Sequence, residues 1–331
     1  MKERIIWIDS VKGIGILLIM LVHMNAAPEF VNYLVPGYVS MFFVASGITL
    51  KLRNDIRQDI VRKAKRILIP YFFYGLSIVL ITVIVSILMH KAPDIMRRIF
   101  GIFYSRRCIE VGGNVPENQL LLPGGCAPLW FMTAFFVSYM LVFLWEKCHK
   151  SYWLIILYAI LSYVLCQLPV LLPWSLDLAP LGALFIITGY QYRQFLTERR
   201  KLSGFLLVVA LFAVFVYANG DTNMSLRECG NIVLFYFIGI LEFQLFALMF
   251  QRCEGTVIES VFAYIGRHSL RLMCIHMFIW VTIKDLLVAK IDEDYTVLMA
   301  YATLTLIFII DTIIERISVR YGKSISLLKY I

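Results

Sequence analysis

The chain has 331 residues, of which 60% are apolar and only 16% are charged, and its formal net charge is +9. Soluble domains are about 45–50% apolar and about 25% charged, so this composition excludes an ordinary soluble globular protein. The basic residues gather in the connections between apolar segments, which indicates membrane orientation and argues against nucleic-acid binding.

Ten apolar stretches are long enough to cross a hydrocarbon core that is about 30 Å thick. We predict membrane-spanning helices at residues 8–24, 36–51, 68–89, 129–145, 152–172, 177–193, 203–218, 230–250, 269–288 and 295–314. The Lys/Arg-rich connections alternate with poorer ones and include both chain ends, so both termini are expected to face the cytoplasm. The sequence therefore predicts an all-α membrane bundle, a single domain over residues 1–331 with no appended soluble domain.

The first apolar stretch carries three ionisable residues on one face. Lys12 and His23 are eleven positions apart, which on a helix separates them by about 20° around the axis and roughly 16 Å along it. Asp9 lies one turn before Lys12, at a spacing where opposite charges meet. Ionisable groups inside a membrane cost free energy, so we expect this face to have a function. A purely structural ion pair between Asp9 and Lys12 is the alternative.

The connection at 51–67 contains a dense basic run. Its members are Arg53, Arg57, Arg62, Lys63, Lys65 and Arg66. Cytoplasmic placement and attraction to anionic lipids explain most such runs. The alternative is a clamp for phosphate groups, because arginine and lysine both suit phosphate oxygens. The residues alone leave both interpretations open.

The connection at 90–128 is long, and it is basic although it belongs to the less basic side. Its arginines are Arg97, Arg98, Arg106 and Arg107. Gly112 and Gly113 mark turns rather than a further span, so we expect an extracytoplasmic loop. Long loops of this kind often act as lids or binding loops. Cys108 and Cys126 both fall here, and the sequence leaves open whether they pair; the seven cysteines show no metal-binding or redox spacing.

Four stretches, spread over nearly the whole chain, together resemble the integral-membrane acyltransferase family 3, bacterial enzymes that modify mostly polysaccharides. They are residues 7–14 closed by His23, residues 41–47, residues 62–71, and residues 264–270 followed by His276. Residues 129–132 are a weaker fifth match. The chain departs from the family pattern in having Lys12 where arginine is common and His268 where asparagine is common. The family's basic pair reads here as Arg62 with Lys65 or as Lys63 with Arg66.

The resemblance implies a catalytic role for His23, since a neutral histidine can remove the proton of an attacking hydroxyl. A histidine that only bonds across helices is the alternative. Asp9 and Lys12 would then shape the active site or the donor site. The resemblance also implies a cytosolic acyl-CoA donor, and with it phosphate contacts from the basic run, at Arg62, Lys63, Lys65 or Arg66.

Four other residues are weaker candidates. His276 is either a second acid/base group or a hydrogen-bonding strut, and the strut is favoured. Ser46 is a packing residue with a hydroxyl donor, Trp130 lies in the weaker fifth match, and Glu242 lies within a predicted span where it would line a cavity.

The expected protein is an O-acetyltransferase of the bacterial inner membrane that uses acetyl-CoA and needs no metal. Its acceptor would be a cell-envelope or secreted glycan, or a lipid-linked precursor, and membrane lipids would surround it. Self-association into a homo-oligomer stays open. A transporter or flippase is the main alternative, because buried charges among many helices also describe transport paths. A sensor that has lost catalysis is a second alternative.

Overall fold

The computed structural model describes residues 5–26, 31, 33–53, 55–88, 90, 94–111, 119–122, 124–287 and 296–321, so that Gly112 and Gly113 lie outside it. Within these residues the regular structure is helical, apart from two isolated β-bridges. The α-helices are α1 (Ile6–His23), α3 (Ser40–Thr49), α4 (Ile56–Leu88), α5 (Ile95–Tyr104), α6 (Trp130–Lys147), α7 (Tyr152–Cys166), α8 (Ala179–Gln191), α9 (Arg193–Thr197), α10 (Leu202–Asn219), α11 (Ile232–Arg252), α12 (Val257–Arg267), α13 (Ser269–Leu287) and α14 (Thr296–Tyr321). The 3-10 helices are η2 (Gly124–Leu129), η3 (Pro173–Ser175) and η4 (Met224–Leu226).

Every one of the ten predicted spans overlaps an α-helix of the described chain. Six helices in the described part are long and apolar enough to cross a membrane. They are Ile6–His23, Ile56–Leu88, Gly125–Lys147, Leu202–Asn219, Ile232–Arg252 and Val297–Arg320. The chain is therefore a multi-pass membrane protein, while the number of ten crossings and the side of the two termini stay predictions.

The connection at 51–67 was predicted to be a loop, but α4 begins at Ile56, so the prediction was wrong from that residue onward. This helix has 33 residues, and at 1.5 Å per residue it is about 50 Å long, which exceeds the hydrocarbon thickness. Most of the basic run therefore forms the polar first turns of α4. Charge indicated where the chain leaves the apolar region, but not where the helix ends.

Besides the short α9, two further helices lie inside connections between the predicted spans. In the 90–128 connection, α5 begins after Asp94, whose side chain accepts a hydrogen bond from the backbone N–H three residues on. In the 251–268 connection, α12 begins after Thr256, which caps it in the same way. Both helices interleave charged and apolar residues, so they hold no continuous apolar run that would have revealed them.

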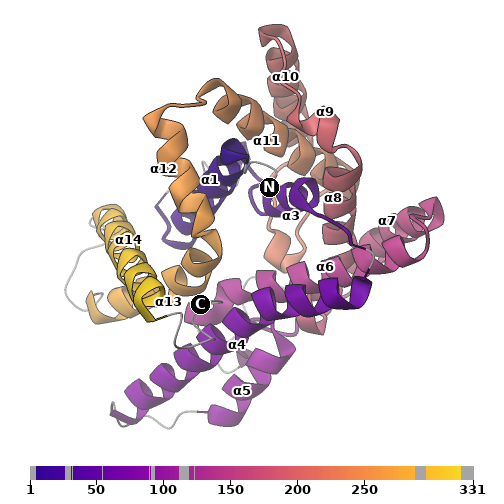
Figure 1. Ribbon diagram of the computed structural model, residues 1–331. Coiled ribbons are helices and arrows are strands. Elements are labelled where there is room, and N and C mark those ends of the chain that lie inside the picture. Colours follow the sequence, from indigo (N-terminus) through magenta and orange to yellow (C-terminus); the bar gives the residue numbers. More distant parts are fainter. Residues whose placement is uncertain are drawn as a thin grey trace.

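Helix α1 lies among α3, α11, α12 and α13, and it packs along α12 (Figure 1). The two backbones touch because glycines meet at the crossing. A Cβ atom on Gly13 would stand 2.0 Å from a carbonyl oxygen of α12, and one on Gly266 would stand 1.7 Å from that of Asp9. Ser10 adds a hydrogen bond to a carbonyl of α12 at 3.0 Å. This crossing holds the start of α1, with Asp9 and Lys12, in place.

A second group of helices is formed by α3, α4, α6 and α8, in which α6 packs on α4 and α8, and α3 packs on α8. Phe131 of α6 meets Phe42 and Phe43 of α3 edge to face, with ring centroids 5.7 and 5.3 Å apart. This arrangement is the favoured one for aromatic rings, and it joins the two helices beside α1.

Candidate functional site

The end of α1 brings a histidine against a second histidine from α13. His23 Nδ1 lies 2.8 Å from His276 Nε2, although the two residues are 253 positions apart in the chain. Their rings are nearly parallel, at 8°, with centroids 5.1 Å apart. His276 is fully buried, and its Nδ1 lies 2.8 Å from the carbonyl oxygen of Leu272.

This hydrogen-bond chain determines the tautomers of the two rings when both are neutral. A carbonyl oxygen only accepts, so Nδ1 of His276 carries the proton and donates it to Leu272. Nε2 of His276 is then the acceptor, and Nδ1 of His23 must donate to it. The proton-free nitrogen of His23 is therefore Nε2. His276 therefore acts as a strut and as an orienting group at once, because the hydrogen bond that it accepts from His23 decides which nitrogen of His23 is basic.

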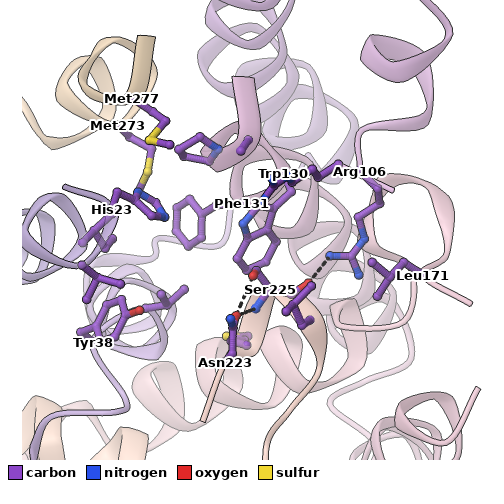
Figure 2. Close-up of a pocket in the computed structure, with 18 of the residues that line it drawn as sticks. His23, Tyr38, Arg106, Trp130, Phe131, Leu171, Asn223, Ser225, Met273 and Met277 are labelled. Carbon is purple, nitrogen blue, oxygen red and sulfur yellow. Dashed lines mark hydrogen bonds between the residues drawn. The ribbon is translucent and has the colours of Figure 1, made fainter. Parts of the chain in front are cut away.

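His23 borders a cavity of about 250 Å³, which we name the His23 cavity. Figure 2 shows His23 on one side of it and Arg106 on the other, with Trp130 and Phe131 between them. The remaining lining comes from several separate segments, including Tyr38, Arg107, Cys108, Leu171, Asn223, Ser225, Met273 and Met277. A space of this size, with aromatic walls and a few polar groups, is typical of a small-molecule site.

A second cavity of about 180 Å³, the Lys12 cavity, lies toward the other end of α1. It brings together residues of all four family-like stretches. Its polar lining is Asp9, Lys12, Ser46, Thr49, Lys63, Arg66, Tyr139, Arg267 and Ser269. Lys12 Nζ lies 3.4 Å from the Asp9 carboxylate, so the predicted ion pair forms at the wall of this cavity. Four basic side chains face one carboxylate here, which makes the cavity attractive to anions.

The structure separates the two versions of the basic pair. Lys63 and Arg66 line the Lys12 cavity, and Lys63 Nζ lies 3.5 Å from the centre of the Tyr139 ring. Arg62 instead pairs with Asp59 one turn earlier on α4. Lys65 is exposed and does not line the cavity. Of the two spacings, only Lys63 with Arg66 contributes to the site.

The two cavities share a wall. Phe131 of α6 and Met273 of α13 line both of them, and both side chains are buried. The two cavities therefore meet at these two side chains. One of these is a methionine, which adapts its shape readily.

The other predicted candidates have distinct places. Ser46 lines the Lys12 cavity and donates to the carbonyl of Phe43 at 2.8 Å, and Trp130 lines the His23 cavity. Glu242 is fully buried and accepts a bond from the backbone N–H of Gly37 at 2.7 Å. It borders neither of these two cavities, so a functional role for Glu242 stays a prediction.

Several lining residues were not among the predicted ones. Arg106 and Arg107 line the His23 cavity. In the sequence, they could have been found from the unexpected basicity of the 90–128 connection. No sequence pattern identifies Asn223 and Ser225 as site residues, because they lie in a short polar turn of a common kind. Arg267 reaches the Lys12 cavity only because α12 exists and ends there.

Cys108 and Cys126 are both free thiols, which answers the question that the sequence left open. In the described part of the chain, no group of three or more His, Cys, Asp or Glu side chains could hold a metal ion.

The helices and the two cavities define a multi-pass membrane protein with polar chambers toward the two ends of its first helix. A family model described as an acyltransferase domain matches residues 5–314, nearly the whole chain. The chain therefore belongs to the integral-membrane acyltransferase family 3, the family that its motifs resemble. No curated protein and no solved structure matches it. Membership of this family does not favour the transporter alternative.

Proposed function

We propose that the protein is a membrane O-acyltransferase that moves an acetyl group from cytosolic acetyl-CoA to a hydroxyl of an envelope glycan or its lipid-linked precursor. The observation that carries the proposal is the hydrogen-bond chain from Leu272 through His276 to His23. It leaves a proton-free Nε2 on a histidine that borders a cavity of about 250 Å³. That is the arrangement a general base requires.

The donor would bind in the Lys12 cavity. The phosphates of coenzyme A suit the basic side chains of Lys63, Arg66 and Arg267, while Asp9 balances the charge of Lys12. The basic first turns of α4 also support a cytoplasmic position for this end of the molecule. In this proposal Lys12 and Asp9 belong to the donor site rather than to the proton transfer.

The acceptor would bind in the His23 cavity and react across the shared wall. His23 Nε2 takes the proton of the acceptor hydroxyl while the hydroxyl oxygen attacks the thioester carbonyl carbon. A carbon–oxygen bond forms, the carbon–sulfur bond breaks, and the proton on His23 passes to the departing thiolate of coenzyme A. The bond to His276 keeps the basic nitrogen turned toward the acceptor throughout.

The distance along α1 fits this division of labour. Lys12 and His23 are roughly 16 Å apart along the helix axis. The pantetheine arm of coenzyme A is a long, flexible linker between phosphates and thioester, so it would bridge this separation. Phe131 and Met273 would surround the thioester at the point where the cavities meet.

The test is acyl transfer by the purified protein with labelled acetyl-CoA and crude envelope glycan, beside a His23→Ala variant. We expect label in the glycan with the native protein and almost none with the variant. The matched control is His149→Asn, because His149 is an exposed histidine in a turn and lines neither cavity. Transfer that survives in His23→Ala, or that never occurs with the native protein, would reject the proposal.

A further inference from the structure

The lining of the His23 cavity carries positive charge. Arg106 and Arg107 both line it, and none of its described lining residues is Asp or Glu. Arg107 is exposed and has no ion-pair partner among the described residues. An unpaired guanidinium at the edge of a cavity presents several hydrogen-bond donors in a fork that matches carboxylate and phosphate oxygens.

A buried cluster next to Arg107 adds to this charge. Arg106 donates to both oxygens of Asp177 at 2.6 and 2.7 Å, and Arg227 Nε lies 3.1 Å from the same carboxylate. The three side chains are at most 1% exposed. Two guanidinium groups share one carboxylate, so one positive charge is left over in a buried place. Buried charge that is not balanced costs free energy, and a nearby anion lowers this cost.

The cluster also holds the cavity wall in shape. Arg106 Nη1 donates to the carbonyl of Ser225 at 3.2 Å, and Arg227 donates to the carbonyls of Leu165 and Leu168. These bonds connect the segment that carries Arg107 with the turn at η4 and with the end of α7. The position of Arg107 therefore rests on a buried network of ion pairs and hydrogen bonds that joins three segments of the chain.

Between the arginines and His23 lies an aromatic surface. Trp130 lies between His23 and Arg106 in Figure 2, and the Arg106 guanidinium carbon is 5.7 Å from its ring centre. The amide of Asn223 and the hydroxyl of Ser225 face the same space. An aromatic ring beside amide, hydroxyl and guanidinium groups is suited to a sugar ring that carries an anionic substituent.

We propose that the acceptor is anionic: a carboxylate or phosphate on it binds Arg107, and this places a nearby sugar hydroxyl at Nε2 of His23. The inference rests on the proposed function, in that it takes the His23 cavity to be the acceptor site. It specifies what that function leaves open, namely the chemical class of the acceptor. A carboxylate would come from an acidic sugar, and a phosphate from a phosphorylated or lipid-linked one.

The test is a binding titration that does not depend on catalysis. The His23→Ala protein in detergent is titrated with glucuronate, glucose 1-phosphate and glucose, and binding is followed by the fluorescence change that disappears in a further Trp130→Phe variant. We expect one of the two anions to bind at least tenfold more tightly than glucose, and its affinity to fall with added salt. Tighter binding of glucuronate indicates an acidic glycan, and tighter binding of glucose 1-phosphate indicates a phosphate-bearing acceptor.

Variants of the arginine then locate the anion. Arg107→Gln should weaken binding of the preferred anion about tenfold, as expected for the loss of one charge-assisted hydrogen bond, while Arg107→Lys should keep most of it. The matched control is Arg97→Gln, which removes a basic residue of the same connection that does not line the cavity. Equal affinity for glucose and both anions, no binding of either anion, or no effect of Arg107→Gln would overturn the inference. Anion binding without any acyl transfer by the native protein would reject the proposed function and leave the anion site standing.

Discussion

The two cavities along α1 are built in different ways. The polar groups of the Lys12 cavity come from helices, namely α1, α3, α4, α6, α12 and α13, and their side chains project from fixed positions. The His23 cavity takes much of its lining from connections, including the segment after α5 and the turn at η4. Helices give precise positions, and connections give shapes that can differ without disturbing the core. In the proposed function, this difference suits one cavity that binds a constant donor and another that selects an acceptor.

The largest expected effect separates the chemistry of the His23 cavity from the binding in the Lys12 cavity. We expect His23→Ala to lower kcat about 1000-fold, within the range that general-base catalysis contributes. Binding of acetyl-CoA should stay within about twofold of the native value, because the Lys12 cavity keeps its residues. Equilibrium binding of labelled acetyl-CoA, measured beside transfer, checks both halves; a parallel loss of donor binding would break the distinction between the two cavities.

The next effect concerns the partner of His23. His276→Leu removes the acceptor for His23 Nδ1–H, so we expect kcat to fall about 100-fold, with KM for acetyl-CoA nearly unchanged. His276→Gln offers an amide oxygen to the same N–H and should restore part of the rate. The pH profile of kcat should also shift in the leucine variant, because the tautomer of His23 is no longer determined. An identical profile and an equal loss in both variants would indicate that His276 only packs.

A smaller effect tests the Lys12 cavity itself. Lys63→Ala combined with Arg66→Ala should raise KM for acetyl-CoA roughly 10- to 30-fold and leave kcat at saturation within about threefold, because phosphate contacts are formed equally in ground and transition states. Lys65→Ala is the matched control, since Lys65 is a neighbouring exposed lysine that does not line the cavity. If Lys65→Ala raises KM as much as the double variant does, general charge rather than the cavity attracts the donor.

The smallest effect concerns the wall between the cavities. Met273 lines both, so Met273→Ala should widen the passage and raise the rate with butyryl-CoA relative to acetyl-CoA by a few fold. Met277 lines only the His23 cavity, so Met277→Ala should leave this ratio unchanged. The ratio of initial rates with the two donors is the measurement. Equal ratios in all three proteins would show that the acyl group does not pass Met273.

The positions of the helices were largely predictable, because a run of about 20 apolar residues has few other uses in a protein. The errors came where a helix continues as a polar structure, as at the start of α4 and in α12. There the backbone keeps its own hydrogen bonds while the side chains change from apolar to charged. Hydropathy reports the polarity of the side chains, but it does not report whether the backbone stays helical.

The sequence predicted which residues belong to the site better than it predicted which of them contact one another. His23, Lys12 and Asp9 follow from their types and spacing on one helix, and the pair of Asp9 with Lys12 is local. The choice of Lys63 and Arg66 over Arg62 and Lys65 depends on the rotation of α4 about its axis. Adjacent residues on a helix point about 100° apart, so a run of basic residues necessarily divides among several faces.

The sequence by itself determined the class of the protein: the membrane helices, the ionisable face of α1 and the motifs of the acyltransferase family are all local patterns along the chain. Only the tertiary structure decided that His276 is the partner of His23, that Phe131 and Met273 separate two cavities, and that Arg106 shares Asp177 with Arg227. The physical reason is that each of these contacts joins segments far apart in the chain. Which segments meet depends on the packing of the whole bundle, and no local spacing encodes it.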